Sequence, residues 1–220
     1  MNRFFVFALV LSFASFAQQL QNKQFVIKAG RVLDVRNQRT LTDQLIVIAG
    51  QQIRSVLPSN ASAVQEAKRA GTLIDLSSST VLPGLIDCHT HLLMDFKLNR
   101  GFDDPNMILT IAQMSTAQRA LLGAKNALEE LKAGITTVRD VGNSGHDGDI
   151  ALRDAIAAGW VPGPSMFVST RALAPVGGQL DHASELGEKL MNEEYAIVTG
   201  TDEARRAVRQ AFFEGPTSLK

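Results

Sequence analysis

The stretch VLPGLIDCHTHLLMD, Val81–Asp95, is the part of this 220-residue sequence on which the predicted fold depends. An apolar run with Pro83 and Gly84 leads into His89 and His91, two of only four histidines. Side chains two apart on an extended strand share a face and lie about 6 to 7 Å apart along the chain. The two imidazoles can therefore meet at one divalent ion such as zinc, for which neutral imidazole is a usual ligand. For a bare His-x-His pair, two surface or stacked histidines are the commoner alternative.

Two neighbours of these histidines add to the prediction. Asp87 is expected on the same face as His89, where it either orients an imidazole or serves as a solvated or capping carboxylate. Cys88 is the only cysteine, which excludes an intrachain disulfide. We expect its side chain on the opposite face from both histidines, packed in the core.

The first 17 residues have the pattern of an export signal. MNRFFVFALVLSFASFA combines one cation, Arg3, with an apolar block over 4–16 and small residues at Ser15 and Ala17. We predict a signal peptide over 1–17, cleavage after Ala17, and export to the periplasm. A buried helix or membrane anchor is the alternative, but the block is shorter than the roughly 20 residues that cross a bilayer. No membrane span is expected in the mature chain.

Composition limits the class of partner. Lys plus Arg and Asp plus Glu both number 22, and 45% of the residues are hydrophobic. A globular chain with no net charge has no overall electrostatic field to attract nucleic acid or an acidic membrane. A small-molecule partner is therefore the expectation.

The patterns divide the chain into two parts. Over 24–82, β-branched runs separated by turns predict a small β-rich unit, with a tight hairpin at Gly50. From 83 to 220, strands alternate with helices, which predicts parallel βα units. The expected strands are GLIDCHTH, ITTVRDVG, PSMFVSTRAL and PTSLK, and the expected helices are MSTAQRALLGAKNALEELKAG, DIALRDAIAAG and TDEARRAVRQAFFEG.

The ends of the helices have their own signals. Gly134 and Gly159 are placed to end the first two helices, and Thr201 is placed to cap the start of the third. Four strands are about half of a closed (β/α)8 barrel, which has eight. His89 and His91 then lie at the carboxyl end of its first strand, where such barrels build active sites.

VLPGLIDCHTHL resembles the signature of the metal-dependent amidohydrolase superfamily. AGITTVRDVG, PVGGQLD and TDEARRAVRQAFFEGPTSLK at the next three strands together resemble the imidazolonepropionase-like branch, which includes exported Xaa-Pro dipeptidases. The resemblance implies an α/β fold, with part of a small β-sandwich over 24–82. Residues 83–220 would form about the first four βα units, an incomplete (β/α)8 TIM barrel.

The resemblance also implies site residues. His89 and His91 match metal ligands of the first strand, and Lys220 matches a fourth-strand lysine that becomes carboxylated and bridges two metal ions. An ammonium has only donors, whereas a carbamate offers an oxygen to each ion; a solvated terminal lysine is the alternative. For substrate binding, His146 in a loop and His182 are candidates. The branch commonly has Gly-Gly-His after the third strand, but Gln179 occupies that third position here.

The activity implied is metal-dependent hydrolysis of carbon–nitrogen bonds other than esters, with two zinc-like ions activating water. Export favours a dipeptidase such as Xaa-Pro dipeptidase in the full-length protein, and a cyclic amidase is the alternative. The family's remaining ligands and its catalytic aspartate would follow Lys220. We therefore expect these 220 residues to be inactive alone, as a truncated product, a non-catalytic remnant or an incomplete sequence. Open strand edges leave a homo-oligomer as an option.

Overall fold

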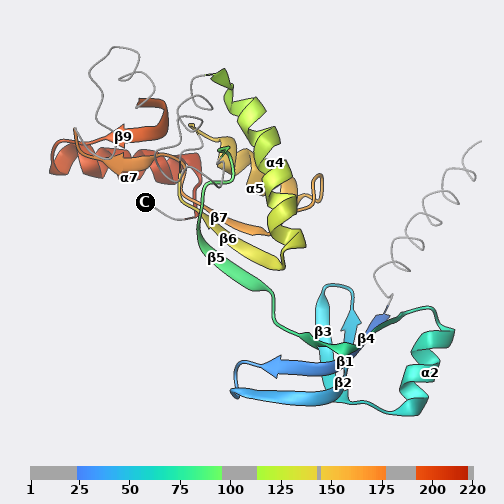
Figure 1. The fold of residues 1–220 in the computed structure, drawn as a ribbon. Helices are drawn as coiled ribbons and strands as arrows, with labels where there is room; N and C mark the ends of the chain where they lie inside the picture. Colours follow the sequence, from blue (N-terminus) through green and yellow to red (C-terminus); the bar gives the residue numbers. More distant parts are fainter. Residues whose placement is uncertain (1–23, 96–112, 143–144, 177–191, 218–220) are drawn as a thin grey trace, which may run out of the picture. The chain divides into compact units, whose positions relative to one another are not determined.

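The computed structural model describes residues 24–95, 113–142, 145–176 and 192–217. The chain divides into two compact units, Met1–Pro83 and Gly84–Lys220, which are described separately below as the N-terminal and C-terminal units (Figure 1). None of the described helices is long and apolar enough to cross a membrane.

The N-terminal unit is a four-stranded mixed sheet with one helix. Its strands are β1 (Gln24–Asp34), β2 (Arg39–Ala49), β3 (Gln52–Pro58) and β4 (Leu73–Val81), in the order β3-β2-β1-β4. Strand β2 pairs antiparallel with β1 and β3, whereas β4 pairs parallel with β1. The predicted hairpin is confirmed between β2 and β3, where Gly50 has a φ of 60°.

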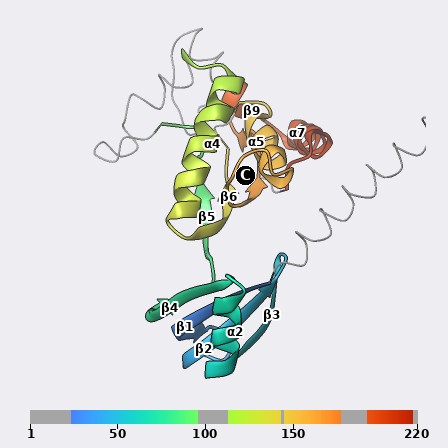
Figure 2. The ribbon, with the colours of Figure 1, turned by 90° about the vertical axis from the view of Figure 1, so that its right-hand side faces the viewer.

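Helix α2 (Ala61–Arg69) was not predicted from the sequence. The side chain of Asn60 caps it by accepting from the backbone N–H of Ala63 at 2.9 Å, and Ala67 packs inward. The helix supplies the crossover from β3 to β4 and lies beside β1 and β4 (Figure 2). The described residues of the N-terminal unit form one sheet, so the second layer of the expected sandwich stays a prediction.

The C-terminal unit begins with a parallel sheet of β5 (Leu85–Thr90), β6 (Ile135–Asp140) and β7 (Ser165–Val168). Helices α4 (Thr116–Lys132) and α5 (Gly148–Ala157) pack against β6 and β7 (Figure 1). The core between these layers is apolar and consists of Leu92, Leu93, Ala127, Val138, Leu152, Met166 and Val168. A two-stranded parallel sheet of β8 (Ala172–Ala174) and β9 (Tyr195–Ile197) follows, and then α7 (Thr201–Glu214).

The helices end where local signals predict. Ser115 and Gln118 form a reciprocal capping box at the start of α4. Gly134 and Gly159, just beyond α4 and α5, have φ angles of 91° and 74°. The predicted cap of α7 is wrong by one residue, because Gly200 holds the N-cap position and Thr201 is already helical.

The expected third strand is broken in two. Strand β7 ends at Val168, and Thr170 then has a φ of 57°, which an extended strand cannot contain. The buried carboxylate of Asp149 accepts the backbone N–H of Thr170 at 2.8 Å and holds this turn. A single strand over PSMFVSTRAL is therefore wrong, because a side chain 21 positions away redirects the backbone.

The start of a fourth strand is visible at Thr217. Its backbone N–H donates to the carbonyl of Val168 at 2.9 Å, and its hydroxyl accepts from the N–H of Val168 at 2.6 Å. The chain therefore runs beside β7 on the side away from β6. Residues 218–220 lie outside the described residues, so the barrel beyond three parallel strands stays a prediction.

Candidate metal centre

Strand β5 has a bulge near its carboxyl end. Its pairing with β6 shifts between Asp87 and Thr90, so that Cys88 and His89 stand opposite the single residue Arg139. An extra residue of this kind interrupts the regular alternation of side chains. Alternation of side chains counted from Asp87 therefore does not predict the face of the sheet on which the histidines lie.

Asp87 lies on the side of the sheet that faces α4. It pairs with Val138 of β6, whose side chain is fully buried beneath the helices. On α4, burial and the nearby Asp87 carboxylate raise the pKa of Glu130. The prediction that Asp87 shares a face with His89 is wrong because the bulge lies between them. Asp87 instead caps the bulge, since its carboxylate accepts the backbone N–H of His89 at 2.9 Å.

Cys88 does not pack in the core. Its thiol is exposed, because β5 is the edge strand of the described sheet and the described helices pack against β6 and β7. The predicted core role is therefore wrong for this structure.

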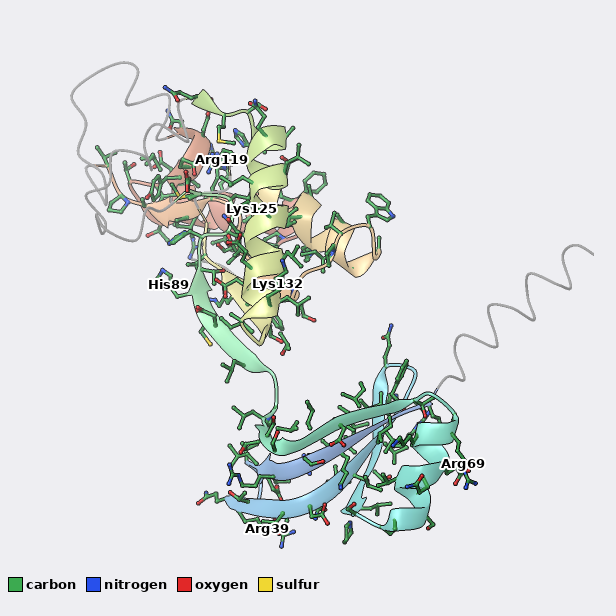
Figure 3. The ribbon with its side chains drawn as sticks, turned by 45° about the vertical axis from the view of Figure 1, so that its right-hand side comes forward. Arg39, Arg69, His89, Arg119, Lys125 and Lys132 are labelled. Carbon is green, nitrogen blue, oxygen red and sulfur yellow. The ribbon has the colours of Figure 1, made fainter. Side chains whose placement is uncertain are left out.

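The two histidines come together after the bulge. The ring centroids of His89 and His91 are 5.3 Å apart, with an angle of 68° between the planes. His89 is exposed on β5 and His91, just beyond the strand, is partly buried (Figure 3). The chain then turns, with the N–H of Met94 donating to the carbonyl of His91 at 3.2 Å. Two imidazoles are thus presented side by side at the carboxyl end of β5.

A hydrogen bond fixes the tautomer of His91. Its Nδ1 lies 2.9 Å from the carbonyl oxygen of Gly142, just beyond β6. A carbonyl only accepts, so Nδ1 carries a proton, and in the neutral imidazole Nε2 then carries the lone pair. Metal-binding histidines typically donate their other ring N–H in this way. The observed geometry therefore fits a divalent ion at Nε2.

The backbone at Gly142 requires glycine. Its φ is 100°, and a Cβ there would lie 2.9 Å from the carbonyl oxygen of Thr170. The carbonyl that receives His91 is thus placed by a conformation other residues avoid. The sequence carried a signal for this position, because Gly142 is the last residue of the second predicted strand, ITTVRDVG.

Of the other predicted site residues, the structure describes only His146. His146 is exposed in a turn before α5, and His182 and Lys220 lie outside the described residues. Among the residues that the structure describes, no group of three His, Cys, Asp or Glu side chains could hold a metal ion. The structure therefore supplies two adjacent imidazoles, and the complete ligand set stays a prediction.

A buried ion pair supports the turn that follows His91. Arg119 of α4 binds Glu194 through both carboxylate oxygens, with Nη2 donating to Oε2 at 3.2 Å (Figure 3). Its Nε also donates to the carbonyl of Leu93 at 3.4 Å. No sequence pattern indicated this pair, because its two members are 75 positions apart.

A cavity of about 400 Å³ lies elsewhere in the C-terminal unit. It is lined by β8, β9 and α7, and Arg171 and Glu214, two of its lining residues, form an ion pair at 3.8 Å. No described histidine lines it, so it carries no argument about the candidate metal centre.

Comparison with known proteins assigns the family. The amidohydrolase family matches residues 80–217 by sequence, and this chain therefore belongs to that family. No curated protein matches the sequence significantly.

Solved structures share the fold. A Xaa-Pro dipeptidase with methionine bound in its active site is 28% identical, with a TM-score of 0.71 over 90% of this chain and 46% of its own. A prolidase complexed with N-methylphosphonate-L-proline is also 28% identical, with a TM-score of 0.67 and the same two coverages. An ochratoxinase from A. niger is 24% identical, covers the same shares and has a TM-score of 0.65. The chain thus spans under half the length of each of these proteins.

Proposed function

We propose that His89 and His91 belong to the metal centre of a hydrolase that cleaves carbon–nitrogen bonds. The observation that carries this proposal is the hydrogen bond from His91 Nδ1 to Gly142, which leaves the lone pair on Nε2 of an imidazole beside a second imidazole. Family membership supports the hydrolase class. Similarity at 28% identity to a Xaa-Pro dipeptidase and a prolidase favours a dipeptidase over a cyclic amidase.

The residues present fit part of a zinc site. His89 and His91 would be two of its ligands, and the carboxylated form of Lys220 is the proposed bridge between two ions. A bound divalent ion would lower the pKa of its water to about 7, which would make hydroxide available at neutral pH. His146 and His182 remain proposed contacts to a small amide or dipeptide substrate.

The chain's own residues have two tasks in this proposal. The Asp87 carboxylate holds the backbone of His89 within the bulge at 2.9 Å. The Gly142 carbonyl holds the ring of His91 and selects its tautomer. These contacts hold the backbone of His89 and the ring of His91, which reduces the orientational entropy lost when an ion binds.

The test uses the protein made from the whole reading frame that encodes these residues. Metal content by elemental analysis should fall to background in His89→Ala and His91→Ala, and His146→Ala serves as a histidine control that keeps its metal. The wild-type protein should hydrolyse Xaa-Pro dipeptides in a panel that includes a cyclic amide. Hydrolysis of only the cyclic amide would overturn the dipeptidase proposal, and metal retention in both ligand variants would overturn the metal centre.

Export is a separate proposal. The pattern over 1–17 supports a cleaved signal peptide and a periplasmic enzyme. Fractionation followed by amino-terminal sequencing should find a periplasmic chain that begins at Gln18. A cytoplasmic chain that retains Met1 would contradict export, and light scattering on the same sample would decide between a monomer and a homo-oligomer.

A further inference from the structure

The side chain of Asp140 contacts both sequence neighbours of His91. It has no exposed surface and lies at the end of β6. Its Oδ2 accepts the backbone N–H of Leu92 at 2.7 Å. The hydroxyl of Thr90 lies 3.3 Å from the same oxygen and 3.4 Å from the carbonyl of Arg139, its two available acceptors. The carboxylate therefore touches the chain immediately before and after the histidine.

The next two residues of the chain continue these contacts. The N–H of Val141 donates to the carbonyl of Thr90 at 3.0 Å, and the carbonyl of Gly142 accepts from His91 Nδ1 at 2.9 Å. Residues 140–142 thus form hydrogen bonds with residues 90–92, about 50 positions earlier. We call residues 140–142 the clasp.

Burial makes the clasp a firm support. Thr90 is 7% exposed, Leu92 is 4% exposed and Val141 is 1% exposed, so water does not compete for these hydrogen bonds. A hydrogen bond to a carboxylate is roughly twice as strong as a neutral one, and it strengthens further in a low dielectric. The hydrogen bond from Leu92 to Asp140, at 2.7 Å, is the shortest of those that the clasp forms.

We propose that Asp140 is a positioning residue for the candidate metal centre. It fixes the backbone on either side of His91, so that the ring can reach the Gly142 carbonyl only through Nδ1. The imidazole is thereby held as the Nδ1–H tautomer, with Nε2 as the ligand nitrogen. Its use by a metal rests on the proposed function, whereas its effect on the tautomer does not.

The first test reads the tautomer without any metal. Long-range proton–nitrogen NMR correlations of the metal-free protein from the whole reading frame at pH 8 should show His91 with its proton on Nδ1. In Asp140→Ala, we expect that signal to be replaced by a mixture of the two tautomers. Asp140→Asn keeps one side-chain oxygen that can accept from Leu92, so this conservative variant should retain most of the Nδ1–H form.

The second test measures metal affinity in the protein from the whole reading frame. Competition between Co²⁺ binding and a chelator should show a loss of about 10- to 100-fold in Asp140→Ala, as is typical when a residue that orients a ligand is removed. Met166→Ala is the control for simple destabilisation, because it creates a cavity in the same core in the middle of β7. It should leave the His91 tautomer and the Co²⁺ affinity unchanged.

The outcomes separate this inference from the proposed function. If Asp140→Ala keeps the Nδ1–H tautomer, or if Met166→Ala changes tautomer and affinity to the same extent, the positioning role is refuted. A tautomer change specific to Asp140→Ala, with partial rescue by Asp140→Asn, supports it. Failure of the proposed function would appear separately, as a wild-type protein that binds no Co²⁺ while its tautomer result stands.

Discussion

Replacing Arg119 by Met tests the support behind the metal-binding turn. The guanidinium joins three segments, because it lies on α4 and binds both the Glu194 carboxylate and the carbonyl of Leu93. The side chains of Arg119 and Glu194 are only 3% and 1% exposed. Methionine preserves much of the side-chain volume, so the substitution removes mainly the charge and the hydrogen bonds.

The expected cost follows from this burial. Removing one partner leaves the Glu194 carboxylate buried without its cation, and breaking a buried pair costs about 3–5 kcal/mol. The exposed pair of Lys125 and Glu129 on the same helix is the matched control, with an N···O distance of 3.2 Å and exposures of 64% and 60% (Figure 3). Exposed pairs four residues apart on a helix contribute about 0.3–0.5 kcal/mol, so Lys125→Met should be nearly neutral.

Urea unfolding of the 220-residue chain, followed by far-ultraviolet circular dichroism, measures the free energy of unfolding of each variant. The double variant Arg119→Met/Glu194→Leu removes both charges of this pair, so it should be at least about 1 kcal/mol more stable than the sum of the single effects predicts. Glu194→Gln preserves shape and serves as a second single variant where Arg119→Met does not fold. A cost for Arg119→Met no greater than that for Lys125→Met, or strict additivity, would refute the reasoning.

Three further predictions concern other features. Burial raises the pKa of the Asp149 carboxyl in the folded protein above its ordinary value of 3.8. Its contribution to stability is therefore present below pH 3.8 and is lost as pH rises through the raised pKa. In urea titrations, the free energy of unfolding of wild type minus that of Asp149→Asn should fall over this pH window. Gly30→Ala would place a Cβ 2.0 Å from a backbone carbonyl oxygen of β4 and should cost about 3 kcal/mol or more. Gly71→Ala, with φ +65° and open space, should cost only about 1–2 kcal/mol. Equal midpoints in thermal unfolding would contradict this ranking. Ser115→Ala removes the capping box of α4 and should cost about 1 kcal/mol, and unchanged urea unfolding would argue against that contribution.

Helix ends were predictable because their causes are local. Gly134 supplies the left-handed conformation just beyond the residues that it terminates. Ser115 accepts from the N–H of Gln118, only three residues away. The one-residue error at Thr201 concerns the boundary of α7 and leaves its existence unchanged. Local chemistry therefore indicated where these predicted helices end, whereas helix α2 (Ala61–Arg69) was missed.

Strand faces were less predictable because pairing partners are distant. Counting in twos placed Asp87 with His89, but pairing with β6 introduces a bulge between them. The same limitation applies at Thr170, where the Asp149 carboxylate breaks an apparently continuous strand. A period of two describes an isolated strand, whereas bulges and kinks arise from its neighbours.

The sequence by itself determined the family, the alternation of strands and helices in the C-terminal unit, and the histidine pair at the end of β5. These features depend on residue identity and on contacts within a few positions. Only the tertiary structure decided which nitrogen of His91 carries the proton, because the accepting carbonyl of Gly142 is 51 positions away. It likewise placed the Asp140 carboxylate against Leu92, 48 positions earlier, since parallel strands bring their carboxyl ends together whatever their separation in sequence.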